Sequence, residues 1–162
     1  MRHRILIVAA LAMVVPAIAS AQEAAASQDP RIIFFRQSDK KMNAAMTQAK
    51  RELPGFWQHF ASPASDEGDF MVKYDVLGGD DAEYIWAGRL RRDGGRLTGA
   101  LVEDAVQVEG LKGGQRVSIP EDRIVDWAYF KGPVMQGSYT TRVMLDQMSP
   151  EEAASFRRTL GW

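Results

Sequence analysis

The feature that most constrains the fold is the stretch over residues 110–129, in which two short strand-like segments are joined by a tight charged turn. Val117 and Ile119 lie in the first segment, and Asp126, Trp127 and Tyr129 lie in the second. Two strands joined this tightly are predicted to pair as a core hairpin, and an isolated hairpin is at best marginally stable in water. The rest of the chain must therefore supply the strands and helices that cover it.

The first 21 residues follow the pattern of a secretory signal peptide: a basic start with Arg2 and Arg4, an apolar run over residues 5–18, and small residues up to Ala21. The apolar run is shorter than the roughly 20 residues of a membrane-spanning helix and contains Pro16. The two arginines are not adjacent, which disfavours a twin-arginine signal, and no cysteine follows the small residues to accept a lipid. We expect cleavage after Ala21 and a soluble periplasmic or secreted protein, with no membrane contact after cleavage.

Composition narrows the function classes further. Cleavage would leave 141 of the 162 residues, which is enough for one domain with a hydrophobic core. The formal charge of −1 becomes −3 when Arg2 and Arg4 are removed, so no basic surface for nucleic acid or anionic lipid is expected. The chain has no cysteine, which excludes disulfides, thiolate metal sites and thiol nucleophiles. The expected partner is a protein or a small-molecule ligand.

The residues after the signal peptide divide into a leader and one domain. Residues 22–37 are predicted to form a flexible leader followed by a short strand, and residues 38–162 a single globular domain. Ser38 is the predicted N-cap of a first helix, and the Pro54-Gly55 pair is predicted to end it before a short helical turn over residues 56–60. The residues predicted to be buried in the first helix recur at spacings of three or four positions and form one apolar stripe: Met42, Ala45, Met46, Ala49 and Leu53.

Three strands are predicted in the middle of the chain, at about residues 70–76, 83–91 and 97–102. The first of them alternates apolar and polar residues, which is typical of a strand with one buried face. Glycines lie in the connections between the predicted strands. Asp93-Gly94-Gly95 is the strongest signal for a hairpin turn, because glycine tolerates positive φ.

The C-terminal part contains one ambiguous and one clear segment. Residues 138–147 fit either a strand or a helix, and we favour a helix because Ser138 can cap it. The Ser149-Pro150-Glu151-Glu152 sequence predicts the start of a last helix that extends to about Leu160. The predicted fold is α+β: an N-terminal helix, a curled antiparallel sheet of about five strands and a C-terminal helix, with a small closed barrel as the alternative.

Several short motifs occur in an order and spacing that can be compared with known families. They are Met42-Asn-Ala-Ala-Met-Thr-Gln-Ala49, Leu53 with Phe56, Val72-Lys73, Glu83-Tyr-Ile-Trp86, Gly99, residues 111–117, Ile124-Val-Asp-Trp127 and Gly137-Ser-Tyr-Thr-Thr-Arg142. Together they resemble the YegJ-like bacterial family known as domain of unknown function 2314, over about residues 39–145. The resemblance implies a small stand-alone or appended domain with a binding or accessory role and carries over no enzymatic activity.

The chain departs from that family pattern at two places. Glu103-Asp104-Ala105 stands where the resemblance leads us to expect an Asn followed by Pro, and Gly114-Gln115 stands where a Gly-Asp turn is expected. If this loop carries the family's function, this member differs in it.

Residue types that carry catalysis are sparse. His59 is the one histidine left after signal removal, and it has no candidate partner nearby in sequence, so we interpret it as structural or exposed. The acidic groups at residues 66–69 and 80–83 lack the spacing of a calcium loop, and the paired glycines precede strands where a phosphate cradle needs a helix. We therefore predict no metal, no cofactor and no catalytic residue.

One set of residues is a candidate binding site with aromatic walls and one or two ionic groups. Its members are Lys73, Glu83, Trp86, Asp126, Trp127, Tyr129, Tyr139 and Arg142. The competing interpretation, which we favour, makes the tryptophans core residues and pairs Asp126 with Arg142 to hold the C-terminal segment.

The function expected from these features is that of an exported, non-enzymatic module that binds a protein or a small ligand. Peptide addition at an exposed strand edge is one form that this binding would take. A carboxylate-dependent hydrolase and an inhibitor or immunity-type protein are the alternatives.

Overall fold

The computed structural model describes residues 4–8, 32–36, 39–79 and 81–162. Strands β1 (Arg4–Val8) and β2 (Ile32–Arg36) pair with each other, and β2 coincides with the short strand expected before the domain. Strand β1 lies within the segment predicted to be a signal peptide and runs parallel to the start of β4 (Ala82–Asp93). The predicted cleavage site and the leader up to residue 31 lie outside the described residues.

Helix α1 (Lys40–Ala61) is longer than predicted. Its N-cap is Asp39, whose carboxylate accepts the Met42 N–H at 3.0 Å, and Ser38 lies outside the described residues. The prediction that Pro54 ends the helix is wrong, because the helix continues through it. A proline inside a helix leaves a carbonyl in the preceding turn without its usual donor, at a cost of about 3 kcal/mol.

Contacts with the sheet offset this cost. The Trp127 indole N–H donates to the Ala49 carbonyl at 2.9 Å, in the turn that precedes Pro54. Beyond the proline, Phe56 is 1% exposed and packs against the Trp127 ring at 5.4 Å between centroids. Burial of Phe56 therefore holds the last two turns in the helix.

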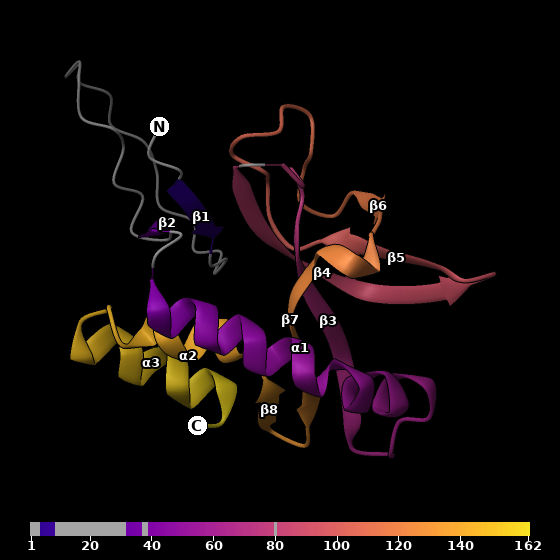
Figure 1. The fold of residues 1–162 in the computed structure, drawn as a ribbon. Helices are drawn as coiled ribbons and strands as arrows, with labels where there is room; N and C mark the ends of the chain where they lie inside the picture. Colours follow the sequence, from indigo (N-terminus) through magenta and orange to yellow (C-terminus); the bar gives the residue numbers. More distant parts are fainter. Residues whose placement is uncertain (1–3, 9–31, 37–38, 80) are drawn as a thin grey trace, which may run out of the picture.

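Together with β1 and β2 the domain strands form one eight-stranded sheet, in which six strands pair antiparallel in the order β6-β5-β4-β3-β7-β8. Besides β4, they are β3 (Glu67–Asp75), β5 (Arg96–Leu101), β6 (Arg116–Ser118), β7 (Ile124–Lys131) and β8 (Val134–Gly137). Register shifts in the β3–β7 and β4–β5 pairs bend the sheet, but it is not closed, so the fold is the predicted α+β class and not the barrel. Strand β8 was not predicted. Figure 1 shows the helices gathered beside β3, β7 and β8, with β5 and β6 extending away.

The hairpin predicted over residues 110–129 is wrong, although both of its strands exist. Strand β6 pairs with β5, and β7 lies between β3 and β8. A 3₁₀ turn, η1 (Glu121–Arg123), carries the chain from one pairing to the other. Ile119 and Ile124, on the two sides of this turn, are 3% and 2% exposed in the same core. Their shared burial fixes the corner without any pairing between the two strands.

Helices α2 (Tyr139–Leu145) and α3 (Pro150–Leu160) complete the fold, and both were predicted as helices. The capping box of Ser149 with Glu152 forms as the sequence indicated, with Pro150 at the first helical position. Ser138 has a φ of 54° and makes no side-chain cap, so α2 begins by another means, described below. No helix in the part of the chain that the structure describes has the length and apolarity to cross a bilayer.

The sheet is covered on both faces. Helix α1 packs on the face that carries Val72, Tyr74 and Ile85, where the main core lies. Because strand side chains alternate, Lys73 and Trp86 point to the opposite face, which is bounded by α2 and α3. The second face of β3 is therefore buried and carries a charged residue.

Candidate functional site

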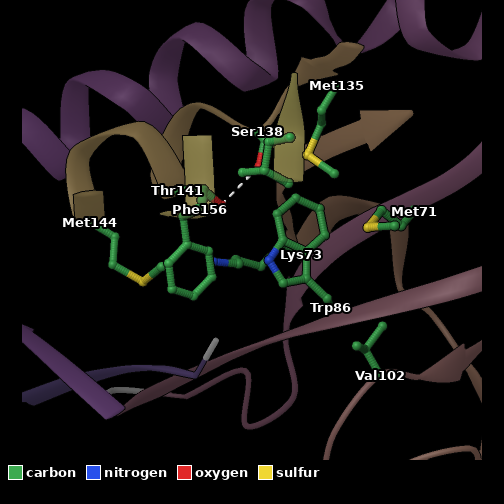
Figure 2. Close-up of a pocket in the computed structure, with 10 residues that line it drawn as sticks. Met71, Lys73, Trp86, Val102, Met135, Ser138, Thr141, Met144 and Phe156 are labelled. Carbon is green, nitrogen blue, oxygen red and sulfur yellow. Dashed lines mark hydrogen bonds between the residues drawn. The ribbon is translucent and has the colours of Figure 1, made fainter. Parts of the chain in front are cut away.

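A pocket of about 200 Å³ lies on this second face, between the sheet and the C-terminal helices. We call it the Lys73 pocket. It is lined by Met71, Lys73, Trp86, Val102, Met135, Ser138, Thr141, Met144, Phe156 and Leu160. Figure 2 shows these side chains converging from strands and helices, with Met135 above Met71 and Met144 beside Phe156. The walls are mainly apolar, and three flexible methionines make them adaptable to different ligand shapes.

Lys73 is the one ionisable group that lines the pocket, and it is 1% exposed. The register of the sheet places it opposite Trp86 on one side and Asp126 on the other. Its ammonium nitrogen lies 5.0 Å from the centroid of the Trp86 ring, a cation–π distance. Within the described residues Lys73 makes no ion pair shorter than 4.0 Å.

Burial decides the protonation of this amine. Removal from water lowers the pKa of Lys73 from 10.5 to about 8, and the negative charges of Asp126 and Glu103 oppose that shift only in part. Glu103 is also buried, at 9% exposure. It lies in the loop after β5, whose residues differ from the family pattern expected from the sequence. The pocket thus combines apolar walls with an amine that is easily made neutral.

Asp126 lies behind the pocket and holds α2. Its carboxylate accepts the backbone N–H groups of Trp127 at 2.9 Å, Tyr139 at 3.2 Å and Thr140 at 2.8 Å, and the Thr140 hydroxyl at 2.6 Å. It therefore satisfies the first N–H groups of α2, which was the role predicted for Ser138. Burial raises the pKa of Asp126, and the Thr140 hydrogen bonds and the Lys73 charge oppose the rise.

The other predicted site residues lie apart from the pocket. Glu83 accepts the N–H groups of Val106 and Gln107, at 2.5 and 2.9 Å, and so anchors the loop after β5. Trp127, Tyr129 and Tyr139 form part of the aromatic core over α1, with Trp127 and Tyr139 edge to face at 5.8 Å.

Arg142 was predicted to pair with Asp126, and this pairing is not found. Its guanidinium stacks on the Trp162 ring at 3.7 Å, and its Nε donates to the Gly137 carbonyl at 3.3 Å. The structure thus joins two of the eight predicted residues, Lys73 and Trp86, in one pocket, with Asp126 as their neighbour.

Sequence reasoning missed most of the pocket lining, including Met71, Met135, Met144, Phe156 and Leu160. Phe156 and Leu160 are four residues apart on α3 and share one helix face, which was a usable signal. Met71 shares the face of Lys73 by strand alternation, but nothing in the sequence shows which helix covers that face.

Carboxylates in the described residues do not gather into a metal site. No group of three His, Asp or Glu side chains there is placed to hold an ion. His59 stacks on Tyr129 at 5.2 Å and lies 3.0 Å from a Glu67 carboxylate oxygen, away from the pocket. The contact with Tyr129 agrees with its interpretation as a structural histidine.

Comparison with known proteins gives one family. The family model described as "Uncharacterized protein conserved in bacteria (DUF2314)" matches residues 39–162. The chain is 27% identical over 119 residues to the uncharacterized protein YegJ of Escherichia coli K12, covering 74% of this chain and 76% of YegJ.

A second similar protein is a putative ankyrin repeat protein of Neisseria meningitidis serogroup B, at 26% identity over 132 residues. That match covers 76% of this chain and 52% of the relative, so the chain spans about half the length of the Neisseria protein. No solved structure matches significantly.

Proposed function

This chain belongs to the DUF2314 family of bacterial proteins, and from this premise we propose that it is an exported, non-enzymatic module that binds a small apolar ligand in the Lys73 pocket. The observation that carries the proposal is a pocket with apolar walls and a single buried amine. Ligand sites commonly combine apolar walls with a few placed polar groups that orient the ligand.

The size and polarity of the pocket define the ligand class. A volume of about 200 Å³ exceeds the roughly 150 Å³ of an apolar cavity that holds benzene, so the ligand has the size of one ring or a short alkyl chain. Lys73 can donate hydrogen bonds, and the Thr141 hydroxyl also lines the pocket. The ligand therefore carries one hydrogen-bond acceptor on an apolar body.

Export is the part of the proposal that rests on the N-terminal sequence. The basic start, apolar run and small residues up to Ala21 support a cleaved signal and a periplasmic or secreted domain.

The hydrolase alternative receives less support from the geometry. Asp126 and Glu83 direct their carboxylates to backbone N–H groups and do not line the pocket. No observation favours the inhibitor or immunity-type alternative over the ligand-binding module.

Calorimetric titration of the chain from Gln22 with 1-hexanol tests the proposal. For a ligand of this size we expect a dissociation constant on the order of 0.1–1 mM. Val102, which lines the pocket and is 46% exposed, marks its accessible side, so Val102→Trp should abolish binding. The matched control is Val106→Trp, at a 56% exposed valine outside the lining, which should bind like the wild type.

The role of Lys73 has its own comparison. Lys73→Met keeps the length and apolar bulk of the side chain but removes the donor, so the preference for hexanol over heptane that we expect of the wild type should be lost or reversed. If the wild type does not bind hexanol, or if Val102→Trp binds as well as Val106→Trp, the proposal is wrong.

A further inference from the structure

We propose that Lys73 captures small apolar aldehydes and ketones as a reversible imine inside the Lys73 pocket. The inference rests on the proposed function, because the carbonyl compound must first occupy that pocket. It adds a covalent step and a chemical class, the carbonyl compounds, to what simple binding requires.

The position of the amine is fixed by the centre of the sheet. Lys73 lies on β3 between β4 and β7, so its backbone is held by pairing on both sides. Its side chain leaves the sheet on the pocket face and passes the Trp86 ring (Figure 2), with the nitrogen 5.0 Å from the ring centroid. A nucleophile set in a rigid strand meets a bound ligand in a constant geometry.

The surroundings favour a neutral, nucleophilic amine. Lys73 is 1% exposed and makes no ion pair within the described residues, whereas the exposed Lys112 and Lys131 each pair with a carboxylate. Burial lowers its pKa to about 8, so about a tenth of the molecules carry the neutral amine at pH 7, against fewer than about one in a thousand for an ordinary lysine. Desolvation in an apolar pocket is a known route to lysines that form Schiff bases.

The reaction is balanced without any oxidant or reductant. The nitrogen lone pair adds to the carbonyl carbon, the carbonyl electron pair moves to oxygen, and that oxygen takes up the proton lost by nitrogen. Loss of this hydroxyl as water then gives the carbon–nitrogen double bond, and hydrolysis reverses both steps. The net change is amine plus carbonyl compound to imine plus water.

The groups that face Lys73 fit the protonated imine as well as they fit the ammonium. Negative charge comes from Asp126 on β7 and from Glu103 in the loop after β5. The walls from α2 and α3 are uncharged, and Ser138 donates to the Thr141 hydroxyl at 2.8 Å beside the pocket. These hydroxyls can exchange protons with the water that leaves or returns.

Reductive trapping tests the inference. The folded chain from Gln22 is incubated with hexanal and cyanoborohydride, digested, and mapped by mass spectrometry for a gain of hexanal less one oxygen. We expect labelling of Lys73 at least tenfold faster than of Lys131, with a rate that rises through pH 8. Val102→Trp should suppress labelling of Lys73 but not of Lys131.

Two variants separate charge from nucleophilicity. Lys73→Arg keeps a cation but cannot form the imine, and Lys73→Met removes both; folding of each is checked by near-ultraviolet circular dichroism. Both should lose the Lys73 adduct. Equal labelling of Lys73 and the surface lysines, or hexanol binding without any adduct at Lys73, would overturn the inference and leave the proposed function intact. Failure to bind hexanol and to label Lys73 would overturn both.

Discussion

Lys73 shows how one residue on a strand can leave a pocket in an otherwise packed face. An apolar residue at this position would simply extend the core beneath α2 and α3. The lysine instead places an amine at 1% exposure against Trp86, and a pocket remains around it. Burying a charge without a close partner costs stability, which is commonly tolerated where function requires the group.

Because burial lowers the pKa of Lys73, we expect the free energy of unfolding to depend on pH. Folded Lys73 loses its proton near pH 8, whereas the unfolded chain keeps its proton up to about 10.5. Between these values the unfolded state binds more protons, so the free energy of unfolding contributed by Lys73 rises with pH. Relative to Lys73→Met, wild-type stability should rise by up to about 3 kcal/mol across this window.

Urea denaturation of both proteins between pH 7 and 10 measures this difference. Tyrosines with raised pKa values, such as Tyr139 at about 12, lower stability at high pH, but they are present in both proteins and cancel. A stability difference that stays flat or falls above pH 8 would contradict the burial of a shifted lysine.

Replacement of Asp126 alone should lower the free energy of unfolding. Asp126→Asn keeps the shape but turns one acceptor oxygen into a donor facing the Thr140 N–H and hydroxyl. Because buried groups left unsatisfied cost about 1–3 kcal/mol each, we expect the free energy of unfolding to fall by about 2 kcal/mol or more. Hexanol binding by the folded fraction should be unchanged.

The control is Asp146→Asn, at an exposed carboxylate 3.7 Å from Lys41, with an expected loss below about 0.5 kcal/mol. Denaturant unfolding compares the two variants. Similar losses in both would mean that Asp126 does not anchor α2.

At the scale of elements, the backbone at the junction between β8 and α2 is packed too closely to leave room for a side chain. Gly137 has a φ of 69°, and a Cβ there would lie 2.3 Å from the Trp127 carbonyl oxygen. Gly137→Ala should therefore destabilise the fold by about 3 kcal/mol or more, from the left-handed backbone and from the clash. Gly132→Ala is the matched control, because Gly132 has a φ of 54° but open space around it, and it should cost about 1–2 kcal/mol.

Denaturation midpoints of these two variants provide the measurement. If the alanine at residue 137 costs no more than the one at residue 132, then β8 and α2 can shift apart without loss. That result would mean that the junction does not hold Ser138 and Thr141 in place beside the pocket.

Most elements could be predicted from local sequence, because local rules determine them. The stripe of α1, the capping box of α3 and the glycine turn after β4 follow from residues close together in the chain. The errors arose where distant residues decide. Pro54 is tolerated because Phe56 and Trp127 pack together. Strand β6 does not pair with β7 because it pairs with β5.

At the scale of the whole molecule, the pocket could not be predicted because it depends on which helix covers which face. Lys73 and Trp86 were selected from their residue types, and their pairing across β3 and β4 was accessible to sequence reasoning. Their cover by Met144, Phe156 and Leu160 depends on how α2 and α3 pack after the chain returns. The resemblance to the DUF2314 family gave the domain but no site.

Export is a prediction that rests on the N-terminal segment. When residues 1–162 are expressed in a bacterium with two membranes, the product should be periplasmic. Its intact mass should match a chain that begins at Gln22. The shortened product should keep the near-ultraviolet spectrum of a folded domain, although β1 and its pairing with β4 are lost. A cytosolic product that retains residues 1–21 would contradict the proposed export.

Methyl NMR of methionine tests the central claim, a ligand-binding pocket over Lys73, most directly. Of the six methionines that follow Ala21, Met71, Met135 and Met144 line the pocket, whereas Met46 and Met148 lie outside its lining and pack in the cluster that contains Met144. Titration of the methyl-labelled chain with 1-hexanol should shift the first three signals together, saturably and with one dissociation constant, and shift Met46 and Met148 much less. Shifts that spread evenly over all methionines, or that never saturate, would contradict a binding site in the Lys73 pocket.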